Sequence, residues 1–240
     1  VEMTTGPLGQ GVATAVGMAM AARFERGLID PDSSANQSLF DHTIWVICSD
    51  GDLQEGVSAE ASSLAGTQEL GNLNVIYDDN RISIEGDTHN AFTEDVSARY
   101  RAYGWQVIEV PAATDGNIDL PAVDAAMISA KAEKNKPTLI RMHSVIAWPA
   151  PKAKGTAGSH GSALGAEEIA ETKKVLGLNP DEHFALPAEV FAHVRKVKER
   201  GASIRKDWNS RLATWQAKQP AEAALLNRLQ SKELPTNWDS

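Results

Sequence analysis

The sequence predicts an α/β fold in which a doubly wound parallel sheet is followed by an all-helical C-terminal tail. Short apolar runs alternate with helix-like segments between residues 43 and 142, as they do when crossover helices join parallel strands. Two of these runs, at residues 43–48 and 73–77, are separated by enough chain for one helix. From residue 165 onward the pattern is helical only.

The N-terminal segment predicts a glycine-rich turn at residues 6–11 and then a packed helix. Residues 12–22 are small and apolar on nearly every side, which is typical of a buried helix with close neighbours. Such a turn lets the backbone approach a ligand, although an ordinary turn before a core helix has the same composition. The polar residues 29–42 are expected to form a surface loop.

The central part of the chain is expected to form the sheet and its helices. Apolar runs of strand length predict strands at residues 43–48, 73–77, 105–110 and 137–142. An alternating pattern predicts a further short, half-buried strand at residues 81–84. Helices are expected at residues 55–70, 93–103 and 120–134, the second of them capped by Thr93 and stopped by Gly104.

The tail is expected to consist of separate helices. One ends near Leu176 and a second runs from Pro187 to Gly201. A third places Ile204, Trp208, Leu212 and Trp215 on one face, which we interpret as core or interface packing. We therefore expect an α/β domain at residues 1–164 and a helical extension, leading toward a further domain, at residues 165–240.

Composition limits the partners that the chain can have. The 240 residues are 42% hydrophobic, which suits one large α/β domain, and the net charge of −9 argues against a nucleic-acid partner. No apolar run reaches the length of a membrane span. The single cysteine, Cys48, excludes an internal disulfide and favours a reducing, cytoplasmic location. Because the chain opens at Val1 rather than at a methionine, it is expected to be a fragment of a longer protein.

Oxygen-bearing side chains follow two of the predicted strands. Asp50 comes after the first strand and Asn80 after the second, so both are expected at the same edge of the sheet. A carboxylate and an amide are hard oxygen ligands, suited to magnesium or calcium. Asp52 gives an Asp-Gly-Asp sequence like that of aspartyl-phosphate phosphatases, but Gln54 stands where their motif has a hydroxyl or apolar residue.

Four segments together resemble the transketolase family. They are Thr-Thr-Gly-Pro-Leu-Gly-Gln-Gly at residues 4–11, Asp50-Gly51 with Glu55-Gly56, Tyr-Asp-Asp-Asn-Arg-Ile-Ser-Ile at residues 77–84, and Ser159-His160-Gly161. They occur in the family's order between residue 4 and about residue 170, and the tail resembles the linker after the family's first domain. The resemblance implies the thiamine-diphosphate-binding fold, with thiamine diphosphate and Mg²⁺ or Ca²⁺ as cofactors.

The resemblance also implies roles for individual residues. The metal ligands would be the side chains of Asp50 and Asn80 and the backbone carbonyl of Ile82. The other cofactor-binding residues would be Gly6, Pro7, Leu8 and Gly51 at the diphosphate end, and Ile84 and Ile146 at the thiazolium. His160 would bind the cofactor near the reacting carbon and act in catalysis. Glu55 and Glu60 would form a proton-sharing network at a subunit interface, although solvated carboxylates have the same pattern.

The activity implied is transketolase, which transfers a two-carbon ketol unit between ketose and aldose sugar phosphates in the pentose phosphate pathway. The family's enzymes are homodimers whose pyrimidine-binding and C-terminal domains are missing from these residues, so the fragment alone is expected to be inactive. The alternatives are another thiamine-diphosphate enzyme, such as a phosphoketolase or a deoxyxylulose-phosphate synthase, and a non-catalytic or split subunit that needs a partner chain. Two departures, Ser49 and Ala147, stand where relatives often have glycine.

Overall fold

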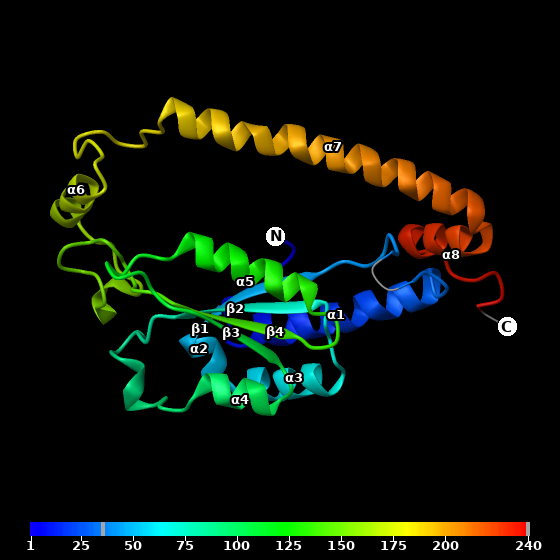
Figure 1. Cartoon of the computed structure of the whole chain (residues 1–240), viewed down its shortest axis with the longest axis horizontal. Helices are drawn as coiled ribbons and strands as arrows, with labels where there is room; N and C mark the ends of the chain where they lie inside the picture. Colours follow the sequence, from blue (N-terminus) through cyan, green and yellow to red (C-terminus); the bar gives the residue numbers. More distant parts are fainter. Residues whose placement is uncertain (35–36, 239–240) are drawn as a thin grey trace. The chain divides into compact units, whose positions relative to one another are not determined.

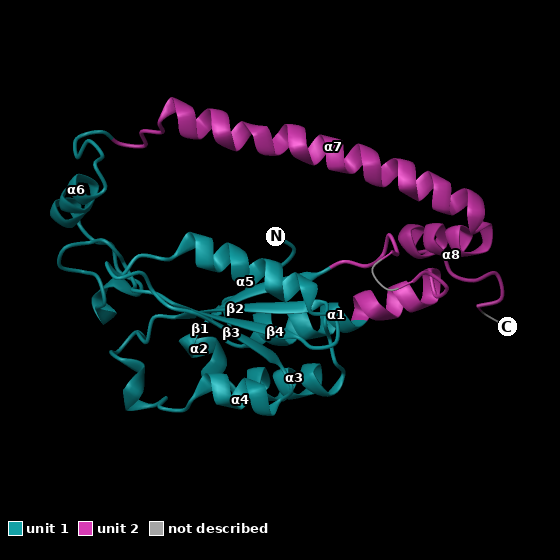
Figure 2. Cartoon of the chain, in the orientation of Figure 1, with its two compact units in different colours: residues 1–20, 43–182 teal, residues 21–42, 183–240 magenta. Residues whose placement is uncertain are grey.

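The computed structural model describes residues 1–34 and 37–238, which form two compact units. Unit 1 contains residues 1–20 and 43–182, and unit 2 contains residues 21–42 and 183–240 (Figure 2). Helix α1, Gln10–Ile29, contributes to both. Each unit is built from two separate stretches of the chain. The expected division of the sequence into domains after residue 164 is a different partition, and it stays a prediction. Residues 239–240 of the expected extension lie outside the described part of the chain.

Unit 1 is built on a fully parallel sheet (Figure 1). Its strands are β1 Ile44–Ser49, β2 Leu73–Asp79, β3 Gln106–Val110 and β4 Thr138–His143, in the order β1-β2-β4-β3. The register aligns Ser49 with Asp78 and Tyr77 with Arg141. The four longer predicted strands are therefore confirmed to within one or two residues at each end.

Helices cover both faces of this sheet, which confirms the predicted doubly wound arrangement (Figure 1). The N-terminal half of α1 packs with α3, Gly56–Thr67, and α4, Val96–Ala102, against one face. Helix α5, Leu120–Ala132, covers the other face. Side chains of β2 alternate between the two cores, because successive residues of a strand point to opposite faces.

Two local predictions in unit 1 are wrong, and one short helix was not foreseen. Residues 81–84 form no strand and keep only an isolated bridge between Ile82 and Asp87, because Arg81 turns the backbone into the left-handed region at φ 60°. The expected helix at residues 55–70 is confirmed as α3, whereas the short helix α2, Asp50–Gln54, which ends before the extended backbone at Glu55, was not predicted. The cap of α4 is Asp95 rather than Thr93, and its carboxylate accepts the N–H of Ala98.

The remaining elements of unit 1 lie on the C-terminal side of its strands. Helix α6, Ala166–Val175, ends before Gly177 as predicted. Short 3₁₀ helices occur at Thr88–Asn90 and Ala157–Ser159.

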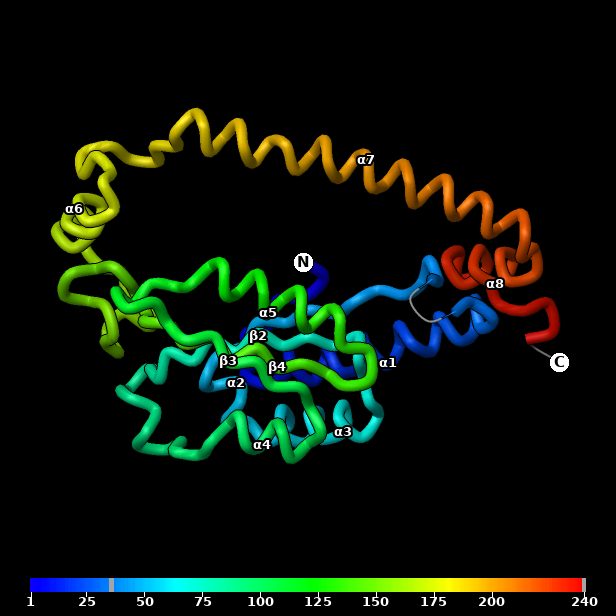
Figure 3. The backbone as a smooth tube through the Cα atoms, in the orientation of Figure 1, coloured from blue at the N-terminus to red at the C-terminus, as the bar shows by residue number. Residues whose placement is uncertain are grey.

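Unit 2 contains the C-terminal half of α1 with α7, Ala188–Lys218, and α8, Pro220–Ser231. The predicted helix end at Gly201 is wrong, since Figure 3 shows α7 as one uninterrupted coil. An isolated glycine costs an exposed helix only about 1 kcal/mol, which does not stop it. Helix α8 was not predicted. No helix of the described residues is both long and apolar enough to cross a membrane.

The core of unit 2 forms around Trp215, whose ring packs edge-on against that of Phe40 with 5.0 Å between the ring centroids. Leu212 packs against this core. The C-terminal end of the predicted apolar face, Leu212 and Trp215, is therefore core as expected, whereas Ile204 is exposed. Residues 29–42 are not wholly a surface loop as predicted. Asp30, Ser38 and Phe40 are buried, and residues 35–36 of that stretch lie outside the described part of the chain.

Asp30 holds this core together through hydrogen bonds. Its carboxylate accepts the hydroxyls of Ser33 at 2.6 Å and Ser38 at 2.5 Å, and the indole N–H of Trp215 at 3.3 Å. Burial alone would raise the pKa of Asp30, but these hydrogen bonds outweigh it and lower the pKa below its ordinary value of 3.8. The stability that Asp30 contributes is thus present at neutral pH and lost as the pH falls through the lowered pKa.

We predict that Asp30→Ala destabilises the protein by about 2–3 kcal/mol at pH 7, because buried donors lose a charged acceptor. The exposed Asp32→Ala is the control and should change stability by less than about 0.5 kcal/mol. Denaturation curves at pH 7 and pH 3 measure both variants. The difference between Asp30→Ala and wild type should shrink at the lower pH, and equal stability of the two proteins at pH 7 would contradict the assignment.

Candidate functional site

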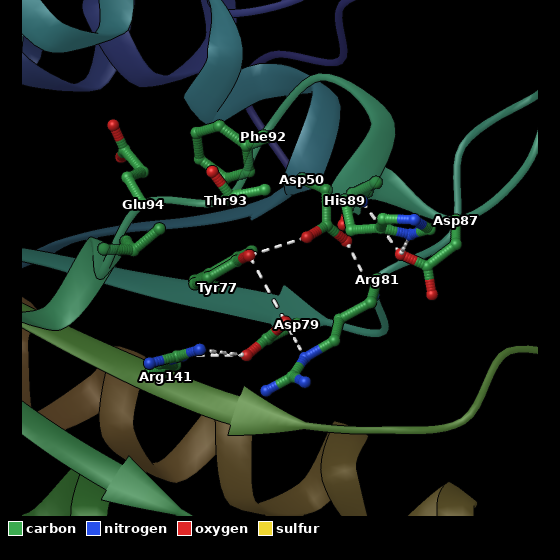
Figure 4. Close-up of a pocket in the computed structure, with 12 residues that line it drawn as sticks. Asp50, Tyr77, Asp79, Arg81, Asp87, His89, Phe92, Thr93, Glu94 and Arg141 are labelled. Atoms are coloured by element: carbon green, nitrogen blue, oxygen red, sulfur yellow. Dashed lines mark hydrogen bonds and ion pairs between the residues drawn. The ribbon is translucent and has the colours of Figure 1, made fainter.

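The structure brings Asp50 and Asn80 to the same edge of the sheet. Asp50 begins α2 directly after β1, and Asn80 follows β2. The backbone N–H of Arg81 donates to Asp50 Oδ2 at 3.1 Å, so the Asn80–Arg81 peptide lies against the carboxylate (Figure 4). The backbone geometry thus places both residues at one edge, while the convergence of their side chains on a ligand stays a prediction.

The Asp50 carboxylate is buried, with 2% of its surface exposed. Burial raises the pKa of Asp50, hydrogen bonds from the Tyr77 hydroxyl and the Arg81 N–H partly offset that rise, and the Asp79 carboxylate adds to it. Among the described residues, no cationic side chain forms an ion pair with Asp50. A buried carboxylate without a cationic partner is chemically suited to a bound metal ion, which supplies the missing charge.

Asn80 is oriented by its neighbours. Its Nδ2 donates to Asp78 Oδ2 at 3.3 Å, and its Oδ1 accepts the N–H of Ile82 at 3.0 Å. Asp78 in turn accepts the hydroxyl of Ser144. The described residues include no group of three or more His, Cys, Asp or Glu able to hold a metal, so a metal at this edge would need the amide and backbone oxygens as well as Asp50.

A buried ion network lies beside Asp50 and was not foreseen from the sequence. Asp79 Oδ2 lies 2.7 Å from both Nε and Nη2 of Arg141 and 3.0 Å from Nδ1 of His143. Burial alone would lower the pKa of Arg141, but the Asp79 carboxylate more than compensates and raises it. The pairing depends on β2 and β4 being neighbours, which the sequence does not state.

A cavity of about 430 Å³ opens beside these side chains (Figure 4). Its lining includes Asp50, Tyr77, Asp79, Arg81, His89 and Glu94. Charges of both signs surround it, and Tyr77 lies between the two buried carboxylates. Burial, followed by the Asp50 carboxylate, raises the pKa of Tyr77, so its hydroxyl acts as a neutral hydrogen-bond donor.

The glycine-rich N-terminal turn packs directly on the Asp50 turn. The N–H of Gly9 donates to Asp52 Oδ1 at 2.9 Å, while Asp52 Oδ2 accepts the N–H of Ser49 at 3.0 Å. A Cβ on Gly51 would lie 3.1 Å from Leu8 Cδ1, so these residues are close neighbours. Asp52 therefore joins the two motifs, a role that sequence reasoning missed.

The other expected site residues lie at or near the surface. The exposed ones are Gly6, Pro7, Leu8, Glu55, Glu60, Ile84 and His160, and the partly buried ones are Ile82 and Ile146. His160 follows the 3₁₀ turn Ala157–Ser159, and its side chain makes no hydrogen bond to a described residue. Glu55 is the N-cap residue of α3, the helix that carries Glu60. The roles of these residues stay predictions.

Ala147, one of the two departures from the family's glycines, has φ 57°. This is the left-handed region, in which a side chain is strained and glycine is not.

The chain is an α/β protein with an open parallel sheet, and it has a buried carboxylate and an amide at the carboxyl ends of adjacent strands, the edge at which sheets of this class bind ligands. A family model described as "Transketolase, thiamine diphosphate binding domain" matches residues 1–235. The chain therefore belongs to the transketolase thiamine-diphosphate-binding domain family, which confirms the family resemblance.

Known transketolases are similar along the whole chain. The transketolase of Mycobacterium leprae is 50% identical over 240 residues, which are 100% of this chain and 34% of that protein. Transketolase 1 of Saccharomyces cerevisiae is 44% identical over 241 residues, again 100% of this chain and 34% of the relative. A solved transketolase of Pichia stipitis, in complex with sedoheptulose-7-phosphate, has a TM-score of 0.90 at 45% identity, covering 100% of this chain and 34% of its own. The chain thus spans about a third of the length of these relatives.

We predict that Gly9→Ala destabilises unit 1 by about 2–4 kcal/mol, since left-handed strain and overpacking add. Gly9 has φ 77°, and a Cβ there would lie 2.8 Å from Glu55 Cβ and 2.9 Å from Ser58 Oγ. Gly17→Ala is the matched control, because its added Cβ meets no other atom within 4 Å in helix α1. That control should be neutral or stabilising by up to about 1 kcal/mol. Calorimetric unfolding of both variants tests this, and equal effects would contradict the packing of the turn.

Proposed function

We propose that this chain is the diphosphate-binding part of a transketolase that uses thiamine diphosphate and a divalent metal, Mg²⁺ or Ca²⁺. The observation that carries the proposal is the buried Asp50 carboxylate at the end of β1, set against the Asn80–Arg81 peptide at the end of β2. Membership of the family supports the same reading. The reaction would move a two-carbon ketol unit from a ketose phosphate to an aldose phosphate.

The whole enzyme extends beyond these residues, because the relatives are about three times as long. Its sugar phosphate substrates are proposed by analogy with the solved P. stipitis transketolases in complex with xylulose-5-phosphate and sedoheptulose-7-phosphate. A homodimer, a cytoplasmic location and a place in the pentose phosphate pathway are part of the same proposal. The exposed Glu55 and Glu60 would be available to a subunit interface. The 240 residues alone would not catalyse the reaction. The aminopyrimidine ring of thiamine diphosphate would be bound by a pyrimidine-binding domain that these residues do not include.

The residues of this chain would divide the work at the diphosphate end. Asp50, the Asn80 side-chain oxygen and the Ile82 carbonyl would hold the metal, and the Gly51 N–H would face the diphosphate, with Leu8 packed behind it. The lack of a Cβ at Gly51 leaves the backbone open to close approach. Gly6 and Pro7 would line the cofactor through their backbone.

At the reacting end, Ile84 and Ile146 would contact the apolar face of the thiazolium. When bound, thiamine diphosphate supplies a nucleophilic carbon and an electron sink. His160 would hold or move a proton between its imidazole and a substrate hydroxyl, because an imidazole has one ring nitrogen that can donate and one that can accept a proton. Its exposed position leaves the ring free to meet a ligand.

We predict that Asp50→Ala abolishes metal-dependent binding of thiamine diphosphate while the fold survives. Loss of a charged ligand to the cation should cost several kcal/mol, so affinity should fall by at least about 100-fold. The full-length protein carrying this sequence is titrated calorimetrically with thiamine diphosphate, with and without Mg²⁺. Asp124→Ala, an exposed acid on α5, is the control and should bind like wild type. Unchanged Mg²⁺-dependent binding by Asp50→Ala would overturn the proposed function.

We also predict that His160→Ala lowers kcat by roughly 10²- to 10⁴-fold, the usual contribution of a general acid–base group, and changes cofactor affinity much less. Steady-state ketol transfer with several donor and acceptor sugars measures the loss. His183→Ala, an exposed histidine of unit 2, should retain wild-type rates. A reduction of less than about threefold across all substrates would assign His160 a structural role.

A further inference from the structure

Both oxygens of the Asp50 carboxylate accept hydrogen bonds inside this chain. The hydroxyl of Tyr77 donates to Oδ1 at 2.6 Å, and the N–H of Arg81 donates to Oδ2 at 3.1 Å (Figure 4). Rotation of the carboxylate about its last torsion would break both bonds. Each oxygen keeps a further lone pair, so ligation remains possible with the group held in this orientation.

We propose that Tyr77 is a positioning residue of the metal site, which holds the Asp50 carboxylate in the orientation in which it binds the metal. This inference rests on the proposed function. Tyr77 would touch neither the metal nor the substrate and would act only through Asp50.

The direction of the Tyr77 hydroxyl is set by the charges around it. Its single hydrogen has two carboxylate acceptors, Asp50 at 2.6 Å and Asp79 at 3.4 Å. Asp79 is already compensated, since Oδ2 is occupied by Arg141 and His143. The proton of Tyr77 therefore goes to the shorter contact with Asp50, whose charge has no cationic partner among the described residues.

The tyrosine ring is itself fixed. Tyr77 lies on β2 between β1 and β4, where it pairs in register with Cys48 and Arg141. It is 1% exposed and belongs to the main core of unit 1. A donor held by the sheet can orient a ligand more rigidly than a donor on a mobile loop, and Mg²⁺ requires near-ideal octahedral geometry. Loss of such an outer partner typically weakens metal binding by roughly 10- to 100-fold.

A purely structural role for Tyr77 predicts a different result, and the chain offers a matched control. Tyr100 is also fully buried in the same core, but its hydroxyl bonds to Ser62 Oγ at 3.0 Å and makes no contact with Asp50. Tyr77→Phe and Tyr100→Phe each remove one buried hydroxyl from the same core. A structural role would make the two variants alike in every measurement, whereas a positioning role separates them in metal dependence.

The experiment uses the full-length protein carrying this sequence. Binding of thiamine diphosphate is measured calorimetrically over a series of MgCl₂ concentrations for wild type and both variants, and unfolding temperatures are recorded without ligand. In Tyr77→Phe the half-saturating Mg²⁺ concentration should rise roughly 10- to 100-fold. In Tyr100→Phe the half-saturating concentration should stay within about twofold of wild type.

Tyr77→Met is a second variant that also lacks the hydroxyl, for use if Tyr77→Phe does not fold, and the same rise is expected. A wild-type Mg²⁺ requirement in a folded Tyr77 variant, or an equal rise in Tyr100→Phe, would overturn the positioning role alone. Wild-type protein that binds thiamine diphosphate without any dependence on Mg²⁺ would overturn the proposed function and this inference together.

Discussion

The burial of the Asp50 charge is the constraint that the geometry at this edge of the sheet must satisfy. A carboxylate that is 2% exposed and has no ion-pair partner among the described residues must be stabilised by fixed hydrogen bonds. Those bonds come from Tyr77 on β2 and from the Arg81 backbone just beyond it. The parallel register of β1 and β2 brings these donors to Asp50, so the sheet and the site form one structure.

The surrounding segments take unfavourable local geometry to complete this arrangement. Arg81 has φ 60°, a region that costs a side-chain-bearing residue about 1–2 kcal/mol, and this turn directs its N–H at Asp50. Gly9 also has a positive φ, which a glycine adopts without strain, and its N–H reaches Asp52, so the N-terminal turn is linked to the start of α2. Strain such as that at Arg81 persists where the surrounding structure over-determines it, and it clusters at functional sites.

Much of this structure could be predicted from the sequence, and the failures have physical causes. Apolar runs determined the strands, and the strand-end rule placed Asp50 with Asn80. The Asp79–Arg141 pair could not be predicted, because it depends on β4 lying beside β2. Residues 81–84 have the alternating pattern of a strand, but no pattern of polarity encodes the left-handed turn at Arg81. Gly201 predicts a helix end, but α7 continues through it, because a single glycine costs an exposed helix only about 1 kcal/mol.

We propose that Asp50, Asn80 and the Ile82 carbonyl hold the metal that accompanies the diphosphate. Crystals of the full-length protein, grown with thiamine diphosphate and Mn²⁺ as a Mg²⁺ substitute, would test it by anomalous diffraction. The account predicts one anomalous peak, ligated by an Asp50 carboxylate oxygen, Asn80 Oδ1 and the carbonyl of Ile82, with Tyr77 still bonded to Asp50. A metal peak at the diphosphate that is held by other residues, or bound cofactor with no peak at this edge, would contradict the account.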